Sequence, residues 1–404
     1  MPVYSYVARD VKGQLVTGST AGADVTIVRR ELRENGLFVV ALSQQRESES
    51  LGARWARMRG VKLADLVIFS QQLATMVGAG LPIVECLHEL IEETENQALR
   101  MALVQIIQDI LAGSTLSQAL ARHPRIFSEL FVALVQAGEV GGVLEHTLAS
   151  IAENLDKEQE LREKVKSAFV YPAVVMVVAT GVVAFMLLVI IPVFQRVYAQ
   201  FHANLPAPTL ALIAVSNFLT HYWWIALAGL AGLVVGFRSF IRTDKGRRIW
   251  DRTKLRLPLF GKLIRKIVVT RFVRTLGALV NAGVPMLAAL HTAARVAANT
   301  EFNDAITQIA GEVTEGASLS GPLRACGKFP NLVPRLVQAG EESGNLGDML
   351  NKTAHFFDRD IEHTVRRLTT LMEPVLTLIL GAIVGLIVVS LYMPIFTLAT
   401  VIRR

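Results

Sequence analysis

Three long runs of apolar residues, separated by amphipathic segments, dominate the hydrophobic pattern of this chain. The runs cover residues 171–195, 218–240 and 372–397. No charged residue lies between Lys166 and Arg196 or between Glu373 and Arg403. A run of about 23 apolar residues forms a helix of about 35 Å, which crosses a hydrocarbon core of about 30 Å with some tilt. The pattern therefore predicts three transmembrane helices.

Basic residues are concentrated after the second apolar run, and they predict the orientation of the chain. The eleven basic residues are Arg242, Lys245, Arg247, Arg248, Arg252, Lys254, Arg256, Lys262, Arg265, Lys266 and Arg271. The 196–217 loop has only Arg196. Because cytoplasmic loops carry the excess of Lys and Arg, residues 241–371 are expected in the cytosol. By alternation the N-terminus is also cytosolic, and the 196–217 loop and the 398–404 tail are external.

The polar segments contain an internal duplication. Residues 65–195 align with 267–397 at an offset of 202 or 203. Gly-Ala-Gly-Leu-Pro at 78–82 faces Asn-Ala-Gly-Val-Pro at 281–285, and Gln-Ala-Gly-Glu at 136–139 faces the same four residues at 338–341. Repeats of this kind indicate repeated structural units. Two related cytosolic domains are therefore expected, each leading into a membrane span.

Within each repeat the apolar positions recur at helical spacing. Helices are expected near 66–78, 82–94, 96–112, 115–122 and 128–137, with a last helix from about 143 that continues into the membrane. The sequence thus predicts an all-α membrane protein. Its segments are a helical repeat at 64–170, a basic segment at 241–265 and a second helical repeat at 266–371.

The N-terminal residues follow another pattern. Residues 4–8, 15–17 and 38–40 are expected to form strands, and residues 24–34 form an amphipathic helix. Residues 1–45 are therefore predicted to be a small mixed α/β domain. The linker at 46–63 is basic, and Arg54 and Arg57 beside Trp55 could hold it on an anionic leaflet. A flexible basic linker is the simpler alternative.

Composition and motifs argue against an enzyme. Hydrophobic residues make up 52% and charged residues 19% of the chain, whereas soluble proteins are about 25% charged. Nucleotide-binding, hydrolase and zinc motifs are absent from the sequence. The two cysteines, Cys86 and Cys326, form no metal-binding pair. No cofactor and no nucleic-acid partner are expected.

Paired carboxylates in the repeats are the best candidates for a site. Glu139 and Glu341 each follow a glycine, Gly138 or Gly340. A carboxylate at such a position can cap a helix, pair with an arginine or bind a hard cation, and the sequence leaves these alternatives open. Glu373, at the start of the third apolar run, is placed to interact with the dipole of that helix. Solvation of its carboxylate at the level of the lipid headgroups is the simpler alternative.

The motifs together resemble those of the type II secretion F / type IV pilus platform (PilC-like) family. The resemblance rests on the two glycine-containing turns, the Gln-Ala-Gly-Glu loops, Pro172 after Tyr171, and Glu373 before Pro374. It covers essentially the whole chain. One departure is Asn281, which replaces Gly78 of the first repeat and puts an identical turn in question.

That resemblance implies a multi-pass protein of the bacterial inner membrane. It would have about six helices in each cytosolic domain and form a dimer or larger homo-oligomer. It would contact a cytosolic assembly ATPase, other inner-membrane components and pilin or pseudopilin subunits. A small-molecule transporter or permease is the alternative, but no ionisable residue lies near the middle of any apolar run. A membrane-bound phosphotransfer enzyme ranks third.

Overall fold

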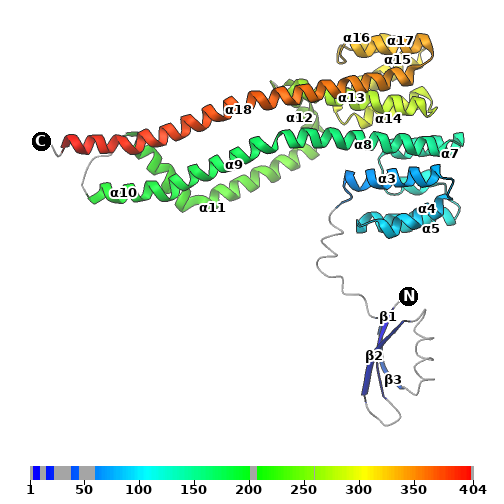
Figure 1. Cartoon of the computed structure of the whole chain (residues 1–404), viewed down its shortest axis with the longest axis horizontal. Helices are drawn as coiled ribbons and strands as arrows, with labels where there is room; N and C mark the ends of the chain where they lie inside the picture. The colour runs from blue at the N-terminus through cyan, green and yellow to red at the C-terminus, as the bar shows by residue number, and fades with distance from the viewer. Residues whose placement is uncertain are drawn as a thin grey trace. The chain divides into compact units, whose positions relative to one another are not determined.

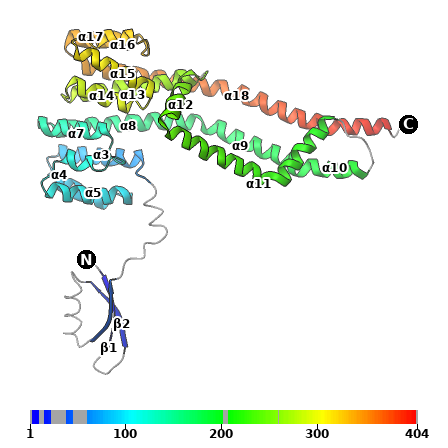
Figure 2. The ribbon, with the colours of Figure 1, turned by 180° about the vertical axis from the view of Figure 1, so that it is seen from behind.

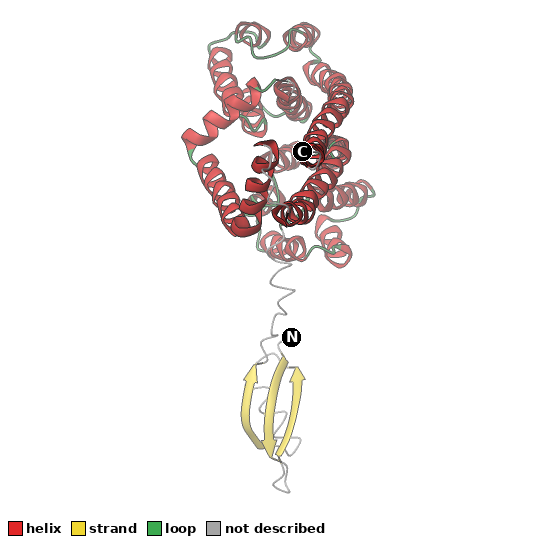
Figure 3. Ribbon diagram, turned by 90° about the vertical axis from the view of Figure 1, so that its left-hand side faces the viewer, coloured by secondary structure: helices red, strands yellow, loops and turns green. Residues whose placement is uncertain are grey.

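The computed structural model describes residues 3–9, 15–21, 38–44, 60–200, 207–258 and 260–401. The N-terminal part is a three-stranded antiparallel sheet of order β2-β1-β3, shown in yellow in Figure 3. Its strands are β1 Val3–Arg9, β2 Leu15–Ala21 and β3 Phe38–Gln44. Val3 pairs with Ala21, and the register of β1 against β3 shifts between Val7 and Ala8. The three predicted strands are therefore present. The predicted helix at 24–34 lies outside the described residues.

Six helices form the first repeat, as the aligned sequence predicts. They are α3 Leu63–Gly78, α4 Ile83–Glu93, α5 Gln97–Leu111, α6 Leu116–Ala121, α7 Glu129–Gly141 and α8 Leu144–Ala168. Helix α3 lies along α8 (Figure 1). Phe69, Phe127 and Phe131 are fully buried in the core. The ring of Phe127 contacts Phe69 at a tilt and Phe131 edge-to-face. Aromatic pairs of this kind add to the free energy gained from burial.

The second repeat has the same order of helices. They are α13 Phe260–Asn281, α14 Met286–Val296, α15 Thr300–Thr314, α16 Ser320–Ala325, α17 Leu332–Ser343 and α18 Leu346–Val401. Phe272, Phe302 and Phe329 form its aromatic core. Helix α13 lies along α18, as α3 lies along α8 in the first repeat (Figure 2). The two domains are therefore built alike.

The glycine-containing turn is the same in both repeats, although Asn281 replaces Gly78. The residue that needs a left-handed backbone is the second glycine, with φ +83° at Gly80 and +78° at Gly283. Two residues before this glycine, Gly78 or Asn281, the larger side chain of one repeat is matched by a smaller residue that packs against it. Glu145 packs against Gly78 in the first repeat, whereas Asn281 packs against Gly347, the counterpart of Glu145, in the second. The sequence departure thus leaves the turn unchanged.

Helices α9 Val170–Phe185, α10 Ile191–Gln200 and α11 Ala207–Arg242 hold the first two predicted spans. A π-helical turn, η1 Met186–Ile190, joins α9 to α10. The last helix of the first repeat continues into the first apolar run as predicted, in one stretch Leu144–Val193. A single turn residue, Phe169 (φ −94°, ψ −4°), separates α8 from α9 within it. Pro172 lacks an N–H, so it cannot complete the hydrogen bonding of the turn at this break. In the second repeat α18 runs through Pro374 without interruption.

Most of the segment expected to be an external loop is helical. Helix α10 extends to Gln200, and α11 begins at Ala207 and bends at Tyr222, whose backbone is not helical (φ −120°, ψ 18°). Before the bend, Ile213 packs with Leu187, Ile191 and Ile387 in an apolar cluster. The segment from Ala207 to His221 is helical because it is apolar enough to pack on the neighbouring helices. Hydrophobic periodicity alone did not distinguish this segment from a loop.

Candidate functional site

The carboxylates of Glu139 and Glu341 cap short helices within their own repeats. One oxygen of Glu139 accepts a hydrogen bond from the backbone N–H of Leu116 at 2.6 Å. The other accepts bonds from the N–H and the hydroxyl of Ser117. Glu341 accepts bonds from the N–H groups of Leu319 (2.6 Å) and Ser320 (3.2 Å). Each carboxylate satisfies the free N–H groups at the start of α6 or α16 and interacts with the helix dipole.

The glycines of the same motif have two further structural roles. Gly138 and Gly340 allow close packing of helices: an added Cβ would lie 2.0 Å from Thr147 Oγ1 in the first repeat and 2.8 Å from Leu346 Cα in the second. Gly142 (φ +68°) and Gly344 (φ +69°) end α7 and α17 in the left-handed conformation, which glycine adopts without strain. The motif therefore joins three helices in each repeat.

This geometry does not favour a metal centre. Within the described parts of the chain, no group of three or more His, Cys, Asp or Glu side chains is placed to hold a metal ion. N–H donors occupy both oxygens of Glu139 and of Glu341. The carboxylates act as helix caps.

The remaining site candidates lie at the membrane boundary or outside the described residues. Pro172 is buried just beyond the break at Phe169, while Glu373 and Pro374 are exposed on α18. Arg54 and Arg57 lie outside the described residues. No interaction brings Glu373 and Pro172 together with the capping carboxylates among the described contacts. The predicted residues therefore do not form one site.

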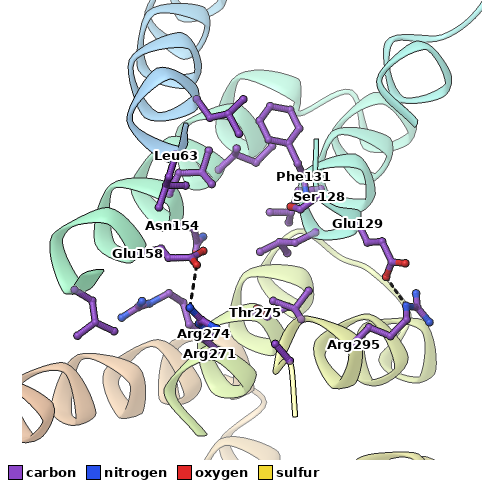
Figure 4. Close-up of a pocket in the computed structure, with 18 of the residues that line it drawn as sticks. Leu63, Ser128, Glu129, Phe131, Asn154, Glu158, Arg271, Arg274, Thr275 and Arg295 are labelled. Atoms are coloured by element: carbon purple, nitrogen blue, oxygen red, sulfur yellow. Dashed lines mark hydrogen bonds and ion pairs between the residues drawn. The ribbon is translucent and has the colours of Figure 1, made fainter. Parts of the chain in front are cut away.

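A cavity of 470 Å³ between the two helical repeats was not predicted. It is lined by α3, α7 and α8 of the first repeat and by α13 and α14 of the second (Figure 4). Two ion pairs cross it. Glu158 pairs with Arg271 at 3.3 Å, and Glu129 pairs with Arg295. Isolated pairs at this exposure contribute little stability, so they fix the register between the repeats more than they hold them together.

The pair between Glu158 and Arg271 involves two positions at which the repeats differ, because Arg271 of the second repeat replaces Ile68 of the first. In the second repeat Asp360, the counterpart of Glu158, pairs with Lys266 of its own repeat at 2.7 Å. The first repeat has Leu63 where the second has Lys266. Glu158 lacks that lysine; it pairs with Arg162 of its own helix at 2.7 Å and with Arg271 across the cavity at 3.3 Å. The exchanges of Leu63 for Lys266 and of Ile68 for Arg271 were sequence signals that could have indicated a contact between the repeats.

Below the cavity the repeats share an apolar contact next to the membrane helices. Leu263, Ile361, Val365 and Leu368 are buried together, and Leu161, Val165, Ala168 and Ile267 pack against them. This cluster joins α8 of the first repeat to α13 and α18 of the second. Movement of one repeat is therefore linked to movement of the other where the apolar helices begin.

Near this cluster, a hydrogen bond from Lys164 and a second from Lys157 lower the pKa of the Glu160 carboxyl. The Glu160 carboxylate in turn raises the pKa of Lys164.

The end of the first repeat farthest from its membrane helix is apolar, and the same end of the second repeat is polar. Val140 is 85% and Leu111 71% exposed, and Val143 is also exposed. These residues lie at one end because Glu139 binds the N–H of Leu116, five residues after Leu111. Their counterparts are Glu342, Thr314 and Asn345. Exposed apolar clusters commonly mark sites of interaction, and this one, the apolar end of repeat 1, has no equivalent in repeat 2.

Among the residues that the structure describes, two helical stretches are long and apolar enough to cross a membrane. They lie within Leu144–Val193 and Leu346–Ser390, and only 11% and 6% of their apolar windows are buried. A core helix of a soluble protein would be mostly buried. Ser216 of α11 donates a hydrogen bond to the carbonyl of Leu187 in the π-helical turn. Such polar contacts join helices inside a bilayer.

The comparisons with known proteins identify the family. The model of type II secretion system protein F matches residues 69–192 and 272–394, and that of its N-terminal domain matches residues 1–43. The two longer matches coincide with the two repeats, which confirms the duplication. The chain belongs to the type II secretion system protein F family.

Curated relatives match almost the whole chain. A type IV pilus assembly protein PilC of Thermus thermophilus is 40% identical over 398 residues, with 98% of both chains covered. PilC of Myxococcus xanthus is 36% identical over 400 residues, covering 99% of this chain and 96% of the relative. A type II secretion system protein F of Pseudomonas aeruginosa is 34% identical over 400 residues, covering 98% and 99%. Together with the two apolar stretches, these relatives indicate an inner-membrane protein.

Proposed function

We propose that this chain is the inner-membrane platform of a type IV pilus or type II secretion machine, without catalytic activity of its own. It couples a cytosolic assembly ATPase to the extrusion of pilin or pseudopilin subunits. The observation that carries the proposal is that each helical repeat leads, through α8 or α18, directly into an apolar membrane helix. A force applied to either repeat is thereby passed to the bilayer.

The proposed topology has three spans. Helix α11 supplies the second, after its bend at Tyr222, and both repeats and the mixed α/β domain of residues 1–45 face the cytosol. This orientation follows from the basic residues after the second span. The protein acts as a dimer or larger homo-oligomer, since a platform below a fibre must contact several subunits at once.

We expect the ATPase to contact residues 1–60 and the apolar end of repeat 1. The N-terminal domain lies outside the duplication and is joined by a basic linker with Arg54 and Arg57, which suits a separate contact. The apolar end provides a second contact, because Leu111, Val140 and Val143 remain exposed. The purified chain alone should not hydrolyse ATP.

Co-purification of the ATPase tests this assignment. A chain lacking residues 1–60 should reach the membrane but lose most of the bound ATPase. The variant L111T/V140E/V143N gives repeat 1 the residues of repeat 2 and should also weaken binding. Its matched control makes the reverse exchange, T314L/E342V/N345V, and should bind normally. Unchanged ATPase binding by both the deletion and the repeat 1 variant would contradict the proposed coupling.

A further inference from the structure

Helix α12 Asp244–Arg256 contacts the end of one membrane helix and the start of another. At its beginning it follows α11 directly, and the ring of Trp250 packs edge-on against Phe237 of α11, with centroids 4.9 Å apart. Just beyond its end, Phe260 packs against Phe169 at 6.1 Å. Phe169 is the residue at which α8 gives way to the membrane helix α9. Both contacts place α12 between the helical repeats and the long apolar helices α9 and α11 (Figure 2).

The inward face of α12 is fixed by close contacts. A Cβ at Gly246 would lie 1.9 Å from the carbonyl oxygen of Phe240, so only glycine fits in this turn. Buried Asp251 accepts a hydrogen bond from the N–H of Thr300 at 3.1 Å, at the start of α15, and pairs with Lys254 at 3.2 Å. These contacts determine which side of the helix faces away from the protein.

That outward side is basic with an apolar centre. Helical spacing brings Lys245, Arg248, Arg252 and Arg256 to one face, with Ile249 among them 57% exposed. Arg248 and Arg252 pair with Asp304 and Glu301 of α15 at 3.7 and 3.3 Å.

Several cations on α12 are not neutralised by a neighbouring carboxylate among the described residues. Among the described residues, Lys245, Arg247 and Arg256 take part in no ion pair. The carboxylates on α12 itself are Asp244, at its first turn, and Asp251, which is buried and already paired. An excess of positive charge around an exposed apolar side chain is typical of a helix that lies on an anionic bilayer surface.

We propose that α12 binds the headgroups of anionic phospholipids in the leaflet that faces the helical repeats. Charge complementarity and the attachment of both helix ends to membrane helices select this occupant. Because Asp251 joins α12 to α15, lipid bound to α12 also anchors the second repeat at the membrane surface. This property is separate from the contact with the ATPase.

Tryptophan quenching can test the proposal on the full chain. Trp250 is made the single tryptophan by replacing Trp55, Trp223 and Trp224 with Phe. The protein is placed in nanodiscs of anionic phosphatidylglycerol and zwitterionic phosphatidylcholine in equal amounts, with bromine near the headgroup end of the acyl chains of one lipid or the other. Bromine on the anionic lipid should quench Trp250 more strongly than bromine on the zwitterionic lipid. High salt should reduce the difference.

Three variants separate the proposed site from general charge effects. K245Q/R256Q should lower the preference for anionic lipid about tenfold or more, since each cation near the surface contributes about fivefold. K245R/R256K should retain the preference. The matched control R335Q/K352Q removes two exposed cations that form no ion pair among the described residues, and it should quench like the parent.

Two results would overturn the proposal. One is equal quenching by the two brominated lipids in the parent protein, which would leave the basic face to an acidic protein partner. The other is an equal loss of preference in the glutamine variant and in its control, which would show that only net charge matters. Unchanged circular dichroism of each variant establishes that the fold is retained.

Discussion

Removal of the Glu139 carboxylate should open the first repeat without opening the second. In Glu139→Ala, the N–H groups of Leu116 and Ser117 and the Ser117 hydroxyl all lose their acceptor. A hydrogen bond to a charged group contributes about 1.5–3 kcal/mol, and water replaces part of it at a half-buried site. We therefore expect a loss of about 3 kcal/mol from the free energy of unfolding of this repeat, consistent with large helix-cap effects.

The native cysteines report on the two repeats separately. Cys86 is fully buried in repeat 1, and burial raises the pKa of its thiol, so it reacts only when the repeat opens. Cys326 is the C-cap residue that follows α16 in repeat 2. Pulsed labelling of the full chain in nanodiscs at pH 8 measures both thiols. A loss of about 3 kcal/mol raises the labelling rate of Cys86 roughly a hundredfold, because the rate follows the population of the open state.

The equivalent variant in repeat 2 is the matched control. Glu341→Ala removes only the two backbone hydrogen bonds, from Leu319 and Ser320. It should speed the labelling of Cys326 by a smaller factor and leave Cys86 unchanged. Glu139→Gln keeps one acceptor oxygen and should fall between Glu139→Ala and the parent. Labelling of Cys86 that changes less than about threefold in Glu139→Ala would refute the capping role, because it corresponds to under 1 kcal/mol.

Three further predictions concern packing, topology and pH. Gly347→Ala should destabilise repeat 2 by about 1–3 kcal/mol, because its Cβ would lie 1.7 Å from Asn281 Oδ1. Adding Asn281→Gly should restore the melting temperature. Failure of this rescue would contradict the packing of Asn281 against Gly347. In a chain without native cysteines, a cysteine that replaces His202 should react with an impermeant thiol reagent on spheroplasts. A cysteine that replaces Ser343 should react only after the spheroplasts are lysed. The reverse result would contradict the proposed orientation. Because its hydrogen bonds to Lys164 and Lys157 lower the folded-state pKa of Glu160, the stabilisation is present at neutral pH and is lost as pH falls through that lowered pKa. The melting temperatures of the parent and Glu160→Gln should therefore converge in acid, and a constant difference would contradict the ion pairs.

Local patterns in the sequence were sufficient for the repeats and their helices. The alternative roles of Glu139 could not be separated from sequence, since a cap and a cation site use the same residue type in the same loop. Only the placement of α6 against α7 shows that Leu116 and Ser117 donate to its carboxylate. The sequence likewise could not show that Asn281 leaves the turn unchanged, because its compensating partner Gly347 is 66 residues away in the chain.

The hydrophobic pattern did not predict contacts between the repeats, and only the charge differences between aligned positions carried a signal of them. The pairing of Glu158 with Arg271 depends on how two separately folded domains meet. The break at Phe169 and the bend at Tyr222 were missed because apolar periodicity continues through both. Hydrophobic pattern specifies that a segment is a helix more reliably than where its axis changes direction.

Fibre assembly in the host bacterium tests the platform assignment most directly. Cells that lack this chain should produce no surface pili or secretion pseudopili by electron microscopy of sheared fractions, while pilin subunits accumulate in the inner membrane. Expression of the intact chain should restore the fibres, and the chain lacking residues 1–60 should not. Normal fibre output in cells without the chain, with no related platform protein present, would contradict the account.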